Sequence, residues 1–129
     1  MQVLRRSSIY ETEPQDLREQ PKFLNLAAEI ETDLPPIELL DWSQEIEARL
    51  GRTRDVPKGP RTIDIDILLY GDLVVETGDL QIPHPRLALR RFVLEPLAEL
   101  APDLRHPVTG RTVAEMLSAV ADQQVKRWN

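Results

Sequence analysis

Hydrophobic and polar positions alternate in the first third of the chain, which is typical of strands. Residues 1–12 are rich in Val, Ile, Ser, Thr and Tyr and predict a first strand. The proline-containing segment 13–21 predicts a loop. Alternation over residues 23–32 predicts a second strand, with every second residue facing the core. The expected core face comprises Leu24, Leu26, Ala28 and Ile30.

Helical spacing follows the second strand. A proline pair at 35–36 suits the first turn of a helix, and Gly51 supplies a C-terminal stop. The expected core stripe of this helix comprises Leu39, Trp42, Ile46 and Leu50. After a polar, basic loop over 51–59, isoleucines alternate with polar residues and predict a strand over 62–70.

The remaining elements complete an α+β pattern. Extended pieces at 73–75 and 80–83 lead to a proline-bounded turn, and helices are expected over 91–100 and 112–120. The apolar side of the last helix comprises Val113, Met116, Leu117 and Val120. We expect a single domain, residues 1–129, in which helices cover one face of an antiparallel sheet.

Composition narrows the class of protein. The chain has no cysteine, which excludes disulfides, thiolate zinc sites and a cysteine nucleophile. A net charge of -6 argues against a nucleic-acid-binding surface. We find no signal peptide and no apolar run long enough to span a membrane, so we expect a cytoplasmic protein. A basic stretch at 52–61 is suited to a small polyanion.

Asp64 and Asp66 are the strongest candidates for metal binding. On a strand, residues at i and i+2 point to the same face, with Cα atoms roughly 7 Å apart. Such a pair can hold one Mg²⁺ ion, or two, together with substrate phosphates. The alternative is an ordinary solvated strand face, which is commoner for an isolated pair of acids. Arg52, Arg54 and Arg61 favour phosphate chemistry, because guanidinium groups match phosphate oxygens.

His84 is a second candidate, because the prolines on both sides restrict its backbone. Arg86, Arg90 and Arg91 follow it closely and, together with the histidine, could clamp a nucleotide. The alternatives are a structural histidine and arginines that only support a helix.

Several motifs resemble those of the 6-hydroxymethyl-7,8-dihydropterin pyrophosphokinases, over residues 4–117 and in the family's order. The motifs are 59–71 (GPRTIDIDILLYG), 83–86 (PHPR), 90–97 (RRFVLEPL), 7–12 (SSIYET) and 20–25 (QPKFLN). The resemblance implies a ferredoxin-like two-layer sandwich. It also implies transfer of pyrophosphate from ATP to the hydroxymethyl pterin in folate biosynthesis, with AMP as the second product.

The resemblance also implies roles for individual residues. The implied magnesium ligands are Asp64 and Asp66. The implied catalytic residues are Arg52, Arg54, Arg61, Asp64 and Asp66. The implied ATP-binding residues are Gln44, Glu47, Arg61, His84 and Arg90. The implied pterin-binding residues are Thr12, Phe23, Asn25 and Phe92. We expect two Mg²⁺ ions as cofactor, ATP and 6-hydroxymethyl-7,8-dihydropterin as the partners, no nucleic acid or membrane partner, and a monomer for the intact family fold.

The sequence departs from the family pattern at two places. The family opens with a strand, a Gly-Ser-Asn turn and a helix, and this sequence lacks them, so the expected fold is N-terminally truncated. A misplaced start codon, an inactive relative or another chain that fills the gap as an oligomer would explain this, and we expect weak or no activity. In the arginine loop, Asp55, Pro57 and Lys58 replace residue types that the family favours.

Two other functions compete with this one. A degenerate relative could bind pterin or nucleotide, or serve as a subunit, without chemistry. A nucleotidyltransferase also places an Asp-x-Asp pair on a strand, but the Gly-Ser helix start expected ahead of its acids is absent from the sequence. The released nucleotide product separates the two enzymes, because nucleotidyl transfer releases pyrophosphate and pyrophosphoryl transfer releases AMP.

Overall fold

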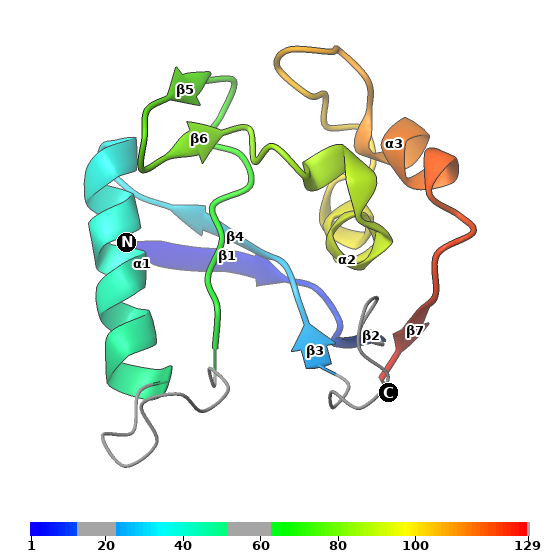
Figure 1. Ribbon diagram of the computed structural model, residues 1–129, viewed down its shortest axis with the longest axis horizontal. Helices are drawn as coiled ribbons and strands as arrows, with labels where there is room; N and C mark the ends of the chain where they lie inside the picture. Colours follow the sequence, from blue (N-terminus) through cyan, green and yellow to red (C-terminus); the bar gives the residue numbers. More distant parts are fainter. Residues whose placement is uncertain (13–22, 52–62, 129) are drawn as a thin grey trace. The chain divides into compact units, whose positions relative to one another are not determined.

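The computed structural model describes residues 1–12, 23–51 and 63–128. The chain divides into two compact units. The first unit comprises Met1–Thr32 and Pro85–Asn129, and the second comprises Asp33–His84. Figure 1 traces the helices and strands of both. The prediction of a mixed α+β fold is confirmed: all strand pairs are antiparallel and helices occur in both units.

Within the described residues, the first unit contains two antiparallel sheets (Figure 1). Strand β1 (Gln2–Arg6) pairs with β4 (Ala28–Glu31). Strand β2 (Tyr10–Thr12) lies between β3 (Phe23–Asn25) and β7 (Val125–Arg127). The sequence did not predict β7, because a short polar strand near a chain end carries almost no alternation signal.

The two strands that were predicted in this unit are each divided in the middle. Between β1 and β2, the backbone N–H of Ser7 donates to the carbonyl of Ala27 at 2.8 Å. The Ser7 hydroxyl accepts from the backbone N–H of Ala27 at 2.9 Å, and both residues are buried. The Ser7 hydroxyl therefore replaces a backbone acceptor between the β1–β4 pairing and the β2–β3 pairing.

The predicted core face of residues 23–32 is wrong. Leu24 is 50% exposed and Leu26 is also exposed, whereas Ala27 on the opposite face is buried. Asn25 lies opposite Tyr10 in the ladder, and directly opposed residues share a face. Tyr10 is buried, so the face that carries Asn25 points inward. Alternation gives the two faces of a strand but not which of them the helices cover.

Helices α2 (Arg91–Leu100) and α3 (Val113–Ala119) agree with the sequence prediction. Helix α2 packs against α3 and against strands β2, β3 and β7. A short 3₁₀ helix, η1 (Leu87–Leu89), precedes α2. The fully buried side chains of this core include Leu87, Leu94, Val113 and Met116. Thr112 begins α3 with a capping box, because its hydroxyl accepts from the Glu115 N–H and the Glu115 carboxylate accepts from the Thr112 N–H.

The second unit contains helix α1 (Pro36–Gly51) and a two-stranded ladder of β5 (Val75–Glu76) and β6 (Gln81–Ile82). The bounds of α1 agree with the prediction, but the expected core stripe is only partly correct. Leu39 is buried and Ile46 is half-buried, while Trp42 and Leu50 are exposed. Ser43 is buried instead, and its hydroxyl donates to the Leu40 carbonyl.

The strand predicted over residues 62–70 does not form in the part that the structure describes, 63–70. The segment is extended and its residues alternate in exposure as far as Ile67, but no ladder pairs it. Alternation predicts an extended backbone with two unlike faces, whereas a strand also needs a backbone partner, which a local pattern cannot supply. Among the helices of the described ranges, none is long and apolar enough to cross a bilayer.

Candidate active site

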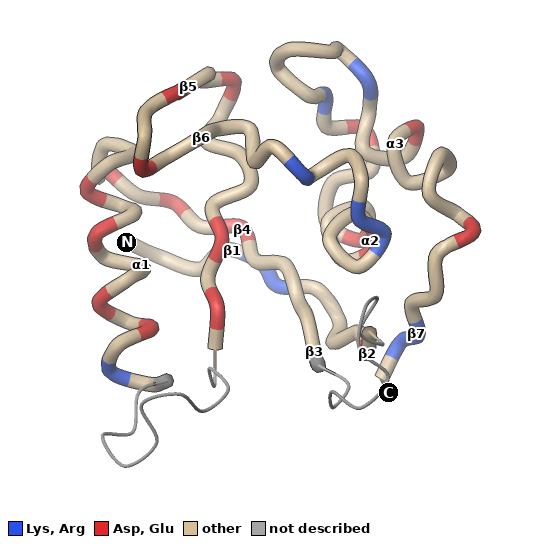
Figure 2. The backbone as a smooth tube through the Cα atoms, viewed as in Figure 1, with Lys and Arg blue, Asp and Glu red and all other residues tan. Residues whose placement is uncertain are grey.

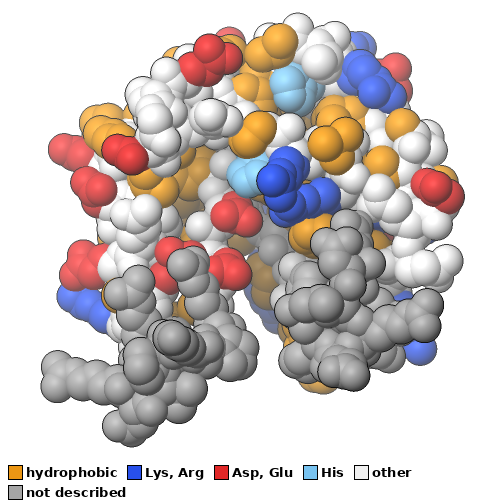
Figure 3. All heavy atoms as spheres, in the orientation of Figure 1, with side chains coloured by type: hydrophobic (Ala, Val, Ile, Leu, Met, Phe, Trp, Pro, Cys, Tyr) orange, Lys and Arg blue, Asp and Glu red, His pale blue; other side chains and the backbone are white. Residues whose placement is uncertain are grey.

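Asp64 and Asp66 are both exposed, whereas the isoleucines at 63, 65 and 67 are partly buried. In an extended backbone this alternation places the two carboxylates on the same side. Within the second unit, acidic residues are frequent along α1 and this extended segment (Figure 2), and Figure 3 shows their side chains at the surface. The exposed acidic residues of this unit's helix are Glu38, Asp41 and Glu45.

Among the described residues, hydrogen bonds to other parts of the second unit hold the extended segment in place of a ladder. The backbone N–H of Ile65 donates to Oε2 of Glu47 at 2.8 Å. Further along, the carbonyl of Leu68 accepts from the backbone N–H of His84 at 2.9 Å. The hydroxyl of Tyr70 donates to the carbonyl of Leu34 at 2.6 Å. The residue between the two aspartates is therefore bonded to helix α1.

The acid pair suits magnesium that is shared with a nucleotide. Within the described ranges, no group of three or more His, Cys, Asp or Glu side chains gathers to form a metal site made by protein alone. Mg²⁺ is commonly held by one or two carboxylates, with phosphates and water as the other ligands. Two exposed carboxylates on one side of a chain are such a donor set.

The predicted pterin-binding residues lie in the first unit. The side-chain Nδ2 of Asn25 donates to Oγ1 of Thr12 at 2.8 Å, and Thr12 is only 3% exposed. Phe23 lies opposite Thr12 in the ladder, while its side chain lies outside what the structure describes. The bond to Thr12 fixes the orientation of the Asn25 amide on the inner face of the sheet.

Arg90 and Phe92 also lie close together in this unit. The guanidinium carbon of Arg90 is 5.4 Å from the centroid of the Phe92 ring, within the range of a cation–π contact. Both side chains are half-buried. Helix α2, which carries Phe92, packs on β2 and β3. The structure thus brings together a residue predicted to bind ATP and one predicted to bind pterin.

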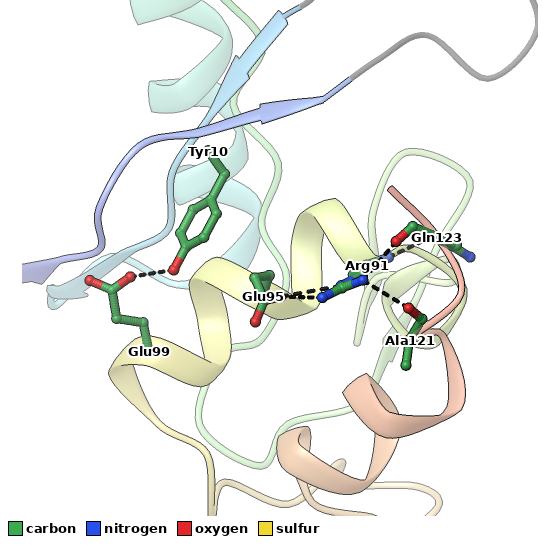
Figure 4. Close-up of polar contacts among 6 residues, drawn as sticks. All are labelled: Tyr10, Arg91, Glu95, Glu99, Ala121 and Gln123. Atoms are coloured by element: carbon green, nitrogen blue, oxygen red, sulfur yellow. Dashed lines mark hydrogen bonds and ion pairs between the residues drawn. The ribbon is translucent and has the colours of Figure 1, made fainter. Parts of the chain in front are cut away.

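Arg91 has a structural role, which the sequence did not distinguish from a nucleotide clamp. Its guanidinium donates to Glu95 Oε1 and to the carbonyls of Ala121 and Gln123, at distances of 2.7 to 3.2 Å (Figure 4). The Gln123 side chain in turn accepts from the Arg91 backbone N–H at 2.8 Å and donates to the Leu89 carbonyl. These bonds fasten the first turn of α2 to the segment after α3.

The remaining predicted residues are distributed as follows. Arg52, Arg54 and Arg61 lie outside the described residues. Gln44 is exposed on α1, and Glu47, one turn further along, is half-buried. His84 is half-buried at the end of the second unit. The described residues predicted for the metal and for the nucleotide therefore belong to the second unit, except Arg90, and those predicted for the pterin belong to the first.

Comparison with known proteins identifies the family. Residues 1–102 match the family model of the 7,8-dihydro-6-hydroxymethylpterin-pyrophosphokinases. The chain is 48% identical over 127 residues to the 2-amino-4-hydroxy-6-hydroxymethyldihydropteridine pyrophosphokinase of Bacillus subtilis, and the match covers 98% of the chain and 71% of that protein. For the Pseudomonas aeruginosa protein of the same name, identity is 45% over 121 residues, which is 94% of the chain and 74% of the relative. The chain belongs to this family.

Longer relatives also match. Identity to the folic acid synthesis protein fol1 of Schizosaccharomyces pombe is 46% over 129 residues, which is 100% of the chain. The chain spans only 18% of that protein, and only 17% of the Pneumocystis carinii protein of the same name. The resemblance noted in the sequence is confirmed at the level of the family.

Proposed function

We propose that this chain transfers a pyrophosphoryl group from ATP to 6-hydroxymethyl-7,8-dihydropterin. The observation that carries the proposal is the exposed pair of aspartates, Asp64 and Asp66, in a chain that belongs to the pyrophosphokinase family. The products are AMP and the pterin pyrophosphate, and the reaction serves folate biosynthesis. A cytoplasmic location and a monomeric state remain predictions.

A ferredoxin-like two-layer sandwich is the architecture that we propose for the family fold. Its support is the antiparallel pairing of the strands and the packing of α2 on β2, β3 and β7. In such a sandwich helices cover one face of an antiparallel sheet.

On the nucleotide side, Asp64 and Asp66 would hold Mg²⁺, as two ions, together with ATP. When bound, the metal would supply positive charge that neutralises the phosphates. Gln44, Glu47, His84 and Arg90 are proposed to surround the nucleotide. Arginines bind phosphate oxygens through a planar fork of donors, and this role is proposed for Arg52, Arg54 and Arg61.

On the pterin side, an oriented amide can read the polar edge of the heterocycle. Asn25 donates one of its amide hydrogens to Thr12, which leaves the other hydrogen and the amide oxygen for a ligand. Aromatic rings stack on flat heterocycles, and Phe23 and Phe92 are proposed for this contact.

The chemistry requires little beyond positioning and charge neutralisation. The hydroxymethyl oxygen of the pterin attacks the β-phosphorus of ATP. A new oxygen–phosphorus bond forms as the bond from the β-phosphorus to the α–β bridging oxygen breaks, and AMP leaves. Phosphoryl-type transfers through loose transition states do not require a strong general base.

The test is a product assay in the presence and absence of the pterin. Protein and substrates are mixed at similar concentrations and followed for a long time, so that slow turnover is also detected. We expect AMP and the pterin pyrophosphate in equal amounts, dependent on both the pterin and Mg²⁺. Release of inorganic pyrophosphate, or no pterin-dependent product from folded protein, would overturn the proposal.

A further inference from the structure

The carboxylate of Glu47 differs from those of the other acidic residues on α1. Glu38, Asp41 and Glu45 are exposed, and Glu45 forms a 2.6 Å ion pair with Arg49 one turn along the helix. Glu47 is half-buried, and its Oε2 accepts a 2.8 Å hydrogen bond from the backbone N–H of Ile65. This side chain points at the segment with the aspartates.

The peptide group that Glu47 binds is the one that joins Asp64 to Ile65. Because a peptide group is planar, a bond to its N–H also orients the carbonyl of Asp64 and restricts the torsions on both sides. Those torsions decide where the carboxylates at 64 and 66 point. A bond at this single amide therefore acts on both acids.

Residues 63–70, which the structure describes, pair with no strand, so no neighbouring strand restrains the backbone torsions next to the aspartates. In a sheet, neighbouring strands fix the backbone at every second residue. The bonds at the Leu68 carbonyl and the Tyr70 hydroxyl come after both aspartates in the sequence. The Glu47 bond is made at the residue between the two acids.

We propose that Glu47 is a positioning residue that sets the geometry of the Asp64 and Asp66 carboxylates through the backbone of Ile65. The inference rests on the proposed function, in which those carboxylates hold Mg²⁺ with the nucleotide. It adds to the role suggested by family resemblance, because Glu47 then also acts on the metal site, through the backbone of Ile65. Two carboxylates must be held close to their working geometry for metal binding to be tight.

Three substitutions separate this role from others. Glu47→Gln keeps an acceptor oxygen at the same reach but removes the charge. Glu47→Asp keeps the charge but shortens the side chain by one methylene, and Glu47→Ala removes the acceptor. The matched control is Glu45→Ala, which removes an exposed carboxylate from the same helix. Thermal melting and circular dichroism show whether each variant is folded.

Two readouts are measured on each protein. The first is calorimetric binding of α,β-methylene-ATP over a range of Mg²⁺ concentrations, which needs no turnover. The second is kcat/KM for pterin-dependent AMP formation, with the KM for the pterin taken separately. We expect Glu47→Ala and Glu47→Asp to weaken Mg²⁺-dependent nucleotide binding and kcat/KM by roughly tenfold, because the backbone N–H of Ile65 loses its acceptor. We expect Glu47→Gln to lose less than Glu47→Ala, and Glu45→Ala to stay close to the wild type.

Two results would overturn the positioning role of Glu47, and a third would overturn only the proposed function. Unchanged Mg²⁺ dependence in folded Glu47→Ala would overturn the inference. Equal loss in Glu47→Gln and Glu47→Ala would also overturn it, because the charge and not the position would then be needed. If Glu47→Ala does not fold, the Glu47→Asp variant decides, because it also removes the bond to Ile65 and an unchanged Mg²⁺ dependence there would overturn the inference. A wild-type protein that binds the analogue with Mg²⁺ but makes no product would overturn the proposed function alone.

Discussion

The hydroxyl of Tyr10 donates a 2.6 Å hydrogen bond to Oε2 of Glu99, which joins strand β2 to helix α2 within the first unit (Figure 4). The other carboxylate oxygen, Oε1, accepts from the backbone N–H and the hydroxyl of Ser8, both at 2.9 Å. Burial raises the pKa of Tyr10 to about 12, and the bond to Glu99 adds to the effect. The same bond is the main reason that the pKa of Glu99 lies below its ordinary value.

Tyr10→Phe should lower the free energy of unfolding by about 1 kcal/mol, because it removes a hydrogen bond to a partly exposed carboxylate while keeping the buried ring. Urea unfolding at neutral pH measures the change. Glu99→Gln is the companion variant and should cost more, because an amide has one acceptor oxygen and cannot serve both the Tyr10 hydroxyl and the Ser8 donors. An unchanged unfolding midpoint in Tyr10→Phe would contradict the assignment.

The free energy of unfolding should fall at both acidic and alkaline pH. The lowered pKa of Glu99 stabilises the fold above the unfolded value of about 4.5, and this contribution is lost as pH falls through the folded pKa. The raised pKa of Tyr10 stabilises the fold below pH 10, and this contribution is lost between about pH 10 and 12. Denaturant unfolding across pH should show both losses in the wild type. The alkaline loss should be smaller in Tyr10→Phe, and an equal loss would contradict the prediction.

Arg91→Ala should destabilise the protein by about 2 kcal/mol, because a partly buried, charge-assisted network is broken and its carbonyl acceptors lose their donors. Arg91→Lys should recover only part of the loss, since an ammonium cannot reproduce the planar fork. The matched control is Arg49→Ala, which removes an exposed ion pair with Glu45 and should cost less than about 0.5 kcal/mol. Equal effects in Arg91→Ala and Arg49→Ala would contradict the structural role.

Asp66→Asn should reduce Mg²⁺-dependent AMP formation by about two orders of magnitude or more, because one carboxylate ligand is lost from the metal. Asp72→Asn, at an exposed acid in the same unit, is the matched control and should leave the rate unchanged. The product assay at saturating ATP measures both. A rate in Asp66→Asn equal to that of the wild type would remove the acid pair from the mechanism.

Thr12→Val should weaken pterin binding roughly tenfold, because the amide of Asn25 loses the acceptor that orients it. Thr12→Ser keeps the acceptor and should bind like the wild type. Fluorescence titration with the pterin provides the dissociation constant, and nucleotide binding serves as an internal control. A parallel loss of nucleotide affinity would indicate a general structural fault.

Local patterns predicted the helices well and the sheets less well. The bounds of α2 agree with the prediction because its apolar positions and its termini are set by residues close together in sequence. The inner face of residues 23–32 was assigned to Leu24 and Leu26, which are exposed, because the covering helix α2 lies far along the chain. The pairing of β7 with β2 is equally remote in sequence.

In the candidate site too, features set by neighbouring residues were predicted, and contacts between residues far apart in sequence were not. The paired aspartates and the arginines were evident from residue type and spacing, and their grouping supported a chemical hypothesis. The bond between Glu47 and Ile65 was not predictable, since nothing in sequence spacing brings a helix carboxylate to one backbone amide. The structural use of Arg91 was hidden for a similar reason, because its partners follow α3.

A backbone segment that is fixed by a few separate hydrogen bonds can be shifted by changing one of those bonds at a time. The segment that carries the aspartates is bonded to the Glu47 carboxylate and to the His84 backbone, and through the Tyr70 hydroxyl to Leu34. These bonds do not depend on the register of a strand pair. A substitution at Glu47 or Tyr70 removes one of these bonds and can shift the acids slightly without moving a sheet. In the proposed function, the metal site of this chain can therefore be adjusted by substitutions at residues that do not contact the metal.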